Sequence, residues 1–305
     1  MKVSIVTPVL NRADLIEEAF ASIQSQEGVE IEHIVVDGGS TDGTLDVVAR
    51  YSHLHVVNLP GSGPEQAINE GIRRATGEFV AFVHSDDRLA PGILAQAAAL
   101  FAARPELDIV SSGGGFFTTG ADGREMVLRT YCRGPLIDLD YRSVLIGPLM
   151  VCARFYRRRI FARIGVFKTE YRYCNDRVFL WRALSAGCVN ACFDEIGYWY
   201  RSHPGSNTVG AGRGVARKIA TEHIELARVS LADPGLSRLH RVWLRRFHAV
   251  ETMRAAAQAL RDGDFGASLD AVKHGFDVSP VWPLVALREL AMLKWLRFTA
   301  QAAKH

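Results

Sequence analysis

The sequence predicts an α/β fold with a doubly wound, mainly parallel sheet, on three observations in the first hundred of its 305 residues. Short apolar, β-rich runs alternate with helical patterns at the spacing of successive β–α units. The first of these runs is continuously apolar, which suits a parallel strand buried on both faces. Polar clusters follow the first, second and fourth runs, at the edge where parallel sheets bind ligands.

The individual elements follow from these patterns. The helix after the first strand begins near Asn11, which is suited to cap it. A second helix opens at Asp42-Gly43-Thr44, and Pro at the start of the third helix matches the preference for Pro in a first helical turn. The expected strands are Val3–Pro8, Ile31–Asp37, His55–Leu59 and Phe79–His84, and the expected second and third helices are 42–51 and Pro64–Ala75.

Beyond residue 108 the alternation becomes irregular. The glycine groups Gly113–Gly115 and Gly120–Gly123 predict turns, and Asp176–Ala186 has a helical pattern. The chain after Asn207 is helical in pattern to its end. We therefore expect a nucleotide-sugar-binding and catalytic domain at 1–208 and a helical, basic extension at 209–305.

Composition narrows the classes of function. The chain is 48% hydrophobic and 23% charged, and its net charge of +3 is too small to indicate a nucleic-acid partner. Residues 201–305 carry 16 Lys and Arg against 9 Asp and Glu, whereas residues 1–200 carry 20 against 24. Five cysteines without a CxxC pair favour reduced thiols and a cytoplasmic protein. No apolar run reaches the length of a membrane span, and no secretory signal is expected.

Ser85-Asp86-Asp87 closes an apolar strand. Adjacent carboxylates repel each other unless a cation or hydrogen-bond donors compensate. Hard oxygen ligands of this kind suit Mg²⁺ or Mn²⁺. The alternative is that Asp87 caps the following helix, and the pair alone leaves both interpretations open.

A second cluster runs from Asp37 to Thr44. Its glycines allow close backbone approach, and the turn leads into a helix N-terminus that favours anions. Asp37 is placed to accept hydrogen bonds from a base or ribose. Ser40 and Asp42 are residue types that also cap helices, so their local role favours capping over ligand binding.

These clusters, in this order, resemble the family-2 inverting glycosyltransferases with a GT-A (Rossmann-like) fold, of the kind that serve bacterial polysaccharide biosynthesis. The resemblance covers about residues 1–205, and four ordered motifs at family spacing make it specific. The matching segments are Val3–Pro8 with Asn11-Arg12, then Val35–Thr44, then Ala67–Ile72 with Ala75–Glu78, then Phe82–Asp87.

The resemblance implies a role for each matching residue. Thr7 and Pro8 lie in the loop that holds the nucleoside, with Ser40 in the second nucleotide motif. Asp37 corresponds to the aspartate that reads the base, commonly uracil, and Asp86 to the member of the DXD-type motif near the ribose. Asp87 corresponds to the ligand of the metal that clamps the diphosphate. The family usually has a second aspartate where this chain has Gly38, which weakens the prediction about the base.

Asp176 matches the family's catalytic base, and Asn175 replaces the usual Glu before it. An acceptor hydroxyl is a weak nucleophile, so a carboxylate must take its proton as the new bond forms. Without the resemblance, a helix cap would be the preferred interpretation of Asp176. Later in the chain, Arg201 or His203 is a candidate to neutralise the leaving diphosphate or contact the acceptor, and His203 is also a candidate metal ligand.

The C-terminal helices carry Lys294 and Arg297 close to Trp295 and Phe298. Such a basic amphipathic helix suits an anionic membrane surface on the inner face of the cytoplasmic membrane. Packing on the catalytic domain or on a second subunit of an oligomer is the alternative.

The expected function is transfer of a sugar from a nucleoside-diphosphate-sugar, commonly a UDP-sugar, to an acceptor hydroxyl on a glycan or lipid-linked saccharide. A sugar-nucleotide nucleotidyltransferase and a non-enzymatic nucleotide-sugar-binding or scaffold protein stay open.

Overall fold

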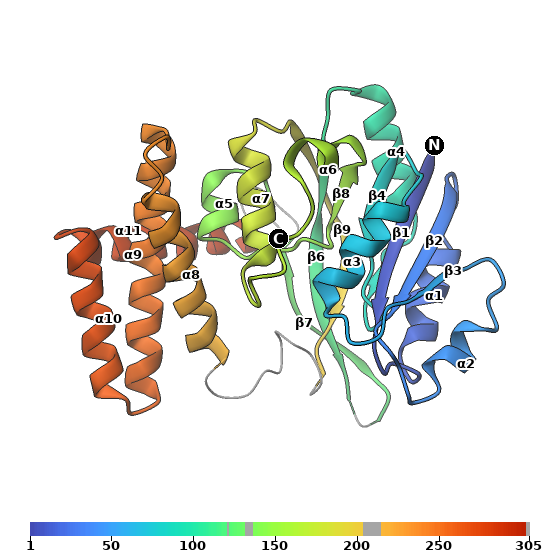
Figure 1. Ribbon diagram of the computed structural model, residues 1–305, viewed down its shortest axis with the longest axis horizontal. Helices are drawn as coiled ribbons and strands as arrows, with labels where there is room; N and C mark the ends of the chain where they lie inside the picture. Colours follow the sequence, from blue (N-terminus) through green and yellow to red (C-terminus); the bar gives the residue numbers. More distant parts are fainter. Residues whose placement is uncertain (121, 132–136, 204–214, 303–305) are drawn as a thin grey trace.

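The computed structural model describes residues 1–120, 122–131, 137–203 and 215–302 (Figure 1). In these residues the strands are β1 (Lys2–Val9), β2 (Glu30–Asp37), β3 (His55–Asn58), β4 (Phe79–Phe82), β5 (Arg88–Leu89), β6 (Ile109–Thr119), β7 (Glu125–Tyr131), β8 (Arg154–Arg157) and β9 (Asn190–Arg201). The helices are α1 (Ile16–Gln24), α2 (Thr44–Val48), α3 (Pro64–Arg74), α4 (Ile93–Ala103), α5 (Tyr141–Leu145), α6 (Arg159–Ile164), α7 (Asn175–Ser185), α8 (Val215–Leu231), α9 (Arg238–Arg261), α10 (Phe265–Val278) and α11 (Trp282–Ala302).

The strands form one twisted sheet, in the order β3-β2-β1-β4-β8-β6-β9-β5, with β7 on the edge of β6. The first four strands of this order are parallel, and β6 pairs with β9 in parallel. The single strand β8 is antiparallel to both β4 and β6, so β4, β6 and β9 run in the same direction. The predicted α/β class with a mainly parallel sheet is confirmed, and the carboxyl ends of β1, β2 and β4 meet at one edge.

Aromatic packing fixes α7 against the sheet. Phe82 at the end of β4 makes an edge contact with Phe167, with ring centroids 5.5 Å apart. Phe167 in turn stacks on Phe179 of α7 at 4.4 Å, and the Phe82 and Phe179 side chains are fully buried. Aromatic pairs of this kind add to the hydrophobic contribution of the buried area. The N-terminus of α7 is thereby held in a fixed position relative to the end of β4.

Two local expectations were wrong. Asn11 does not cap a helix: it has a positive φ of 53°, and its side-chain oxygen accepts a hydrogen bond from the Thr41 amide at 2.8 Å. Gly113–Gly115 do not form a turn but lie inside β6. Gly115 is needed there because a Cβ on it would lie 2.4 Å from the ring of Trp199 on the neighbouring strand β9.

The helices α8–α11 gather at the end of the molecule opposite α2 and β3, and α7 lies between them and the sheet (Figure 1). The helix α9 packs against α8, α10 and α11. The expected boundary between residues 208 and 209 lies outside the described residues. In the described part of the chain no helix has both the length and the apolar character needed to cross a membrane.

Candidate functional site

Two adjacent carboxylates, Asp86 and Asp87, follow β4 at the carboxyl edge of the sheet. The Asp87 side chain is buried, and each of its oxygens accepts a hydrogen bond at 2.8 Å from a residue of β9, one from the Tyr198 hydroxyl and one from the Arg201 amide. Asp86 is more open. Its Oδ2 lies 2.9 Å from His203 Nε2 and 3.8 Å from Arg12 Nε.

The two carboxylates differ in their electrostatics. Burial, and then the neighbouring charge of Asp86, raise the pKa of Asp87 well above its usual value. Burial also opposes the charge on Asp86, but His84, His203 and Arg12 outweigh it and lower the pKa of Asp86. The site therefore holds one ionised carboxylate beside a second whose charge is strongly opposed. A divalent cation bound here would relieve that opposition.

The donor set fits such a cation. Carboxylate oxygens are the ligands that Mg²⁺ and Mn²⁺ prefer, and these ions fill the rest of their shell with phosphate oxygens and water. Each carboxylate oxygen of Asp87 can accept a further contact beside its present hydrogen bond. Within the described ranges no group of three or more His, Cys, Asp or Glu is arranged to hold a metal. Asp86 and Asp87 would therefore hold the ion together with oxygens from a ligand.

Asp176 lies in the first turn of α7 and is partly exposed. Burial, and then the charge of Glu65 at the start of α3, raise its pKa to about 7, against the opposing effect of Arg177. Among the described residues nothing hydrogen-bonds to its carboxylate. A carboxyl group with a pKa near neutrality and free oxygens is suited to take a proton from a bound hydroxyl.

The structure brings the three aspartates to one place, although Asp176 is about ninety residues from the other two. The buried Cys152 thiol is close enough to feel the charge of all three. Burial, and then the charges of Asp176, Asp87 and Asp86, raise its pKa well above the usual value. The predicted metal site and the predicted base thus lie near the same buried thiol.

The residues predicted to bind the nucleotide are placed differently. Thr7 and Pro8 lie within β1 and not in the loop after it. The Thr7 side chain is fully buried, and its hydroxyl lies 2.9 Å from His33 Nε2, because it points into the layer between sheet and helix. The Asp37 carboxylate is also buried and accepts hydrogen bonds from the amides of Gly39 and Ser40.

The Ser40 side chain makes a hydrogen bond to the loop that follows β1. Its hydroxyl accepts a hydrogen bond from the Asn11 amide at 2.9 Å. The Asp42 carboxylate accepts from the Thr44 amide at 3.0 Å, directly before α2. The N-cap of α2 is Gly43, without a side-chain cap hydrogen bond, so the expected capping by Ser40 or Asp42 is wrong. These contacts join the loop after β1 to the loop after β2.

Arg201 does not reach toward a ligand. Its side chain is buried, donates to the Asp86 carbonyl at 3.1 Å, pairs with Glu18 and lies over the Phe117 ring. These contacts hold the acidic loop in position, so Arg201 is not available to neutralise a diphosphate. Sequence reasoning missed Arg12 as a site residue, although it stands in the first motif. It is one-quarter exposed beside Asp86 and is the better candidate for that role.

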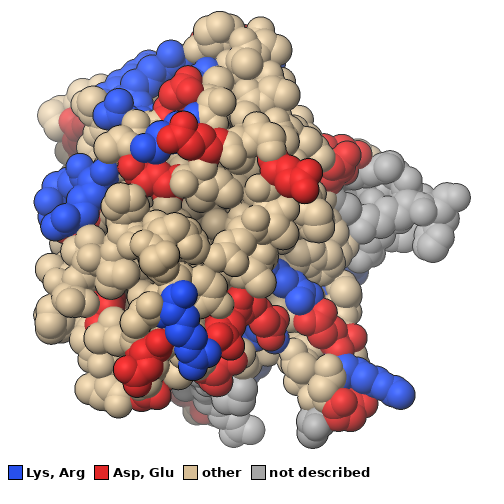
Figure 2. Space-filling model, turned by 90° about the vertical axis from the view of Figure 1, so that its right-hand side faces the viewer, with Lys and Arg blue, Asp and Glu red and all other residues tan. Residues whose placement is uncertain are grey.

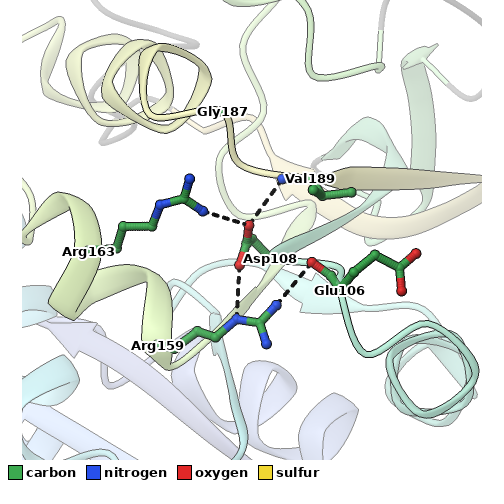
Figure 3. Close-up of a pocket in the computed structure, with 6 residues that line it drawn as sticks. All are labelled: Glu106, Asp108, Arg159, Arg163, Gly187 and Val189. Carbon is green, nitrogen blue, oxygen red and sulfur yellow. Dashed lines mark hydrogen bonds and ion pairs between the residues drawn. The ribbon is translucent and has the colours of Figure 1, made fainter.

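One face of the molecule carries charged side chains of both signs (Figure 2). On the face that carries α2 and β3, acidic and basic side chains are interspersed over the lower half (Figure 2). A separate pocket surrounds Asp108, which pairs with Arg159 at 3.0 Å and Arg163 at 3.2 Å (Figure 3). Because Asp108 precedes β6, which runs parallel to β4, this pocket lies at the opposite edge of the sheet from Asp86. Its two arginines hold α6 to the start of β6.

Known proteins resemble this chain in sequence. Residues 4–165 match the family model described as "Glycosyl transferase family 2". An uncharacterised glycosyltransferase of Mycobacterium tuberculosis (strain CDC 1551 / Oshkosh) is 31% identical over 217 residues, which are 66% of this chain and 78% of that protein. A "PGL/p-HBAD biosynthesis glycosyltransferase" of Mycobacterium bovis (strain BCG / Pasteur 1173P2) is 31% identical over 192 residues, 60% of this chain and 69% of the relative.

Two solved structures have a similar fold. The crystal structure of residues 1–349 of S. aureus TarS in complex with UDP-GlcNAc matches with a TM-score of 0.67 at 22% identity, over 95% of this chain and 88% of that chain. The mannosyltransferase PcManGT from Pyrobaculum calidifontis, in complex with GDP-Man and Mn²⁺, matches with a TM-score of 0.57 at 21% identity, over 99% and 86%. The GT-A fold predicted from sequence is confirmed.

Proposed function

The chain belongs to glycosyltransferase family 2, and on that premise we propose that it transfers a sugar from a nucleoside-diphosphate-sugar, first of all a UDP-sugar, to a hydroxyl of a saccharide or lipid-linked saccharide. The observation that carries this proposal is the meeting of the Asp86–Asp87 pair with Asp176, a carboxyl group whose pKa is raised to about 7. The Asp86–Asp87 pair is suited to binding a metal-bound diphosphate, and Asp176 is suited to abstracting a proton.

Asp86 and Asp87 would hold Mg²⁺ or Mn²⁺, with His203 as a further candidate ligand. The ion, when bound, neutralises negative charge on the departing nucleoside diphosphate. The mannosyltransferase with a similar fold was solved with Mn²⁺, which supports a divalent ion here. Arg12, beside Asp86, adds a positive charge next to the diphosphate. The Asp37–Ser40 loop, at the carboxyl end of β2, would lie against the nucleoside.

Asp176 would take the proton of the acceptor hydroxyl while its oxygen attacks the anomeric carbon. Because attack comes from the side opposite the departing diphosphate, a single displacement inverts the configuration at that carbon. No protein nucleophile is needed for one displacement, as in inverting glycosidases. Placement of the acceptor and base together removes much of the entropic barrier to the reaction.

The test compares the wild-type protein with Asp176→Asn. Nucleotide-sugars are screened with Mn²⁺ for protection against thermal unfolding. A donor at 100 times its Kd should stabilise the protein by about 2.7 kcal/mol. We expect Asp176→Asn to keep this stabilisation and to lose transfer. Asp176→Asn with normal transfer would exclude the proposed base. Release of pyrophosphate from a sugar phosphate and a nucleoside triphosphate would instead identify a nucleotidyltransferase.

We also propose that α11 lies on an anionic membrane, which would bring a lipid-linked acceptor to the enzyme. One face of α11 is buried, whereas Leu284, Leu287 and Trp295 on the other face are 70%, 57% and 58% exposed. Arg288 and Lys294 are exposed on that same side. The acidic residue of the described α11, Glu289, is buried and pairs with two arginines. Apolar and cationic side chains without an exposed acid suit anionic lipid.

Co-sedimentation with phosphatidylglycerol vesicles tests this surface. We expect binding that Leu284→Glu with Leu287→Glu abolishes, and that Leu239→Glu, a matched change at an exposed leucine of α9, leaves intact. Equal binding to neutral phosphatidylcholine would argue against the role of charge. A lipid-free dimer that the double variant dissociates would show that a second copy covers this face.

A further inference from the structure

The helix α8 reaches the chain on both sides of Asp176 with two consecutive residues. The Glu222 carboxylate accepts hydrogen bonds from the amides of Arg172 and Tyr173, at 2.7 and 2.5 Å, just before α7 begins. The next residue, His223, accepts a hydrogen bond from Arg177 Nε at 3.3 Å, just after Asp176. The predicted base therefore stands between two attachments to one helix of the C-terminal part.

The attachment through Glu222 holds the segment that leads into α7. Cys174, at the N-cap of α7, makes no side-chain hydrogen bond to cap the helix. The two amides ahead of it are satisfied by a carboxylate from α8, and hydrogen bonds to a charged acceptor are stronger than those between neutral groups. These amides precede the N-cap, so Glu222 fixes how the chain enters the first turn, where Asp176 lies.

The attachment through His223 belongs to a buried network. Because Nε2 accepts from Arg177, the proton is assigned to Nδ1, which donates to Glu251 at 3.1 Å. Glu251 also pairs with Arg254, whose guanidinium donates to the Ile146 carbonyl at 3.1 Å. His223 and Glu251 are almost completely buried, and Arg177 is nearly so.

The same network closes on a second helix. Arg177 donates to the Val144 carbonyl near the C-terminus of α5, one of the groups that a helix end leaves unpaired. Its guanidinium also lies over the Phe247 ring of α9, 5.4 Å from the centroid. Removal of one member would leave buried polar groups unpaired, so the network holds its members in one arrangement.

We propose that α8 is a positioning element for the chemical step, in which Glu222 and His223 hold the backbone around Asp176 in the orientation that proton transfer requires. This inference rests on the proposed role of Asp176. It assigns the C-terminal helices a part in turnover that is separate from donor binding. A displacement of a catalytic group by about 1 Å can cost on the order of 100-fold in rate.

The experiment uses the full chain with Glu222→Ala, Glu222→Gln and the matched control Glu225→Ala. Glu225 lies one turn further along α8, is exposed and pairs with Arg228. We expect Glu222→Ala to lower kcat by about 10- to 100-fold with donor Kd unchanged within twofold. Glu222→Gln, which keeps an acceptor oxygen, should restore most of the rate. Glu225→Ala should match the wild-type protein.

Unchanged kcat in folded Glu222→Ala would overturn the proposal, and so would parallel losses of donor affinity and kcat. If Glu222→Ala does not fold, His223→Gln gives the same test. We expect His223→Gln to lower kcat at constant donor Kd, and a wild-type kcat in this variant would refute the proposal. Asp176→Asn separates this inference from the proposed function. If Asp176→Asn is fully active, the proposed base is refuted. If Asp176→Asn is inactive but Glu222→Ala is fully active, only the positioning role of α8 is refuted.

Discussion

The raised pKa of Asp176 predicts an unusual pH dependence of turnover. The base acts as the carboxylate, so activity is lost as pH falls through its pKa of about 7, whereas a carboxyl group with the ordinary pKa of 3.8 would stay ionised. With a pKa of about 7, roughly half of Asp176 is ionised at pH 7 and about 3% at pH 5.5. The acid limb of kcat/KM, which reports the free enzyme, should therefore fall roughly 15-fold over this interval.

The change Glu65→Gln tests the electrostatic contribution to the raised pKa of Asp176, which adds to the larger effect of burial. Glu65 is the neighbouring charge that raises the pKa of Asp176, so its neutralisation should move the acid limb to lower pH. Glu106→Gln, at an exposed carboxylate near the opposite edge of the sheet, should leave the limb in place. Donor Kd is measured at each pH by calorimetry to exclude weaker binding. A wild-type limb near pH 4, or one that Glu65→Gln leaves unmoved, would refute this account.

Further predictions concern the acidic pair and the sheet. Asp87→Ala should abolish the Mn²⁺-dependent rise in melting temperature with donor, measured by differential scanning fluorimetry, whereas Asp122→Ala on an exposed turn should keep it. Gly197→Ala should destabilise the fold by about 1–3 kcal/mol in urea unfolding, because its Cβ would lie 2.3 Å from Ser112 Oγ. Gly266→Ala in α10, with no atom closer than 3.7 Å, should be neutral or stabilising; equal losses in the two variants would contradict the packing argument.

Local sequence patterns were sufficient for the strands and helices of the N-terminal half, because each depends on periodicity and turn residues close in sequence. They were misleading at Gly113–Gly115. Glycine groups are typical of turns, but here Gly115 makes room for Trp199, which is distant in sequence and comes beside it only through strand pairing. Asn11 was misassigned for a similar reason, since its partner Thr41 lies 30 residues away.

The candidate site could likewise be predicted only in part from the sequence. Asp86, Asp87 and Asp176 could be proposed from motifs, because each motif is local. Their surroundings could not: Tyr198, which binds Asp87, is 111 residues distant from it. The burial of Arg201 depends on Glu18 and Phe117, which the sequence does not connect with it. The contribution of α8 could not be predicted either, because nothing in the local sequence distinguishes Glu222 from an ordinary surface glutamate of a helix.

The contacts of Asp87 have a consequence for how the protein would meet its donor. The Tyr198 hydroxyl donates to Asp87 and accepts from the His84 amide, so one side chain of β9 joins both ends of the acidic loop. With the Arg201 amide on the other oxygen, the carboxylate is already locked in one orientation in the free protein. A preorganised ligand loses little conformational entropy when it engages its target, so affinity would be governed mainly by charge and fit and less by rearrangement of this loop.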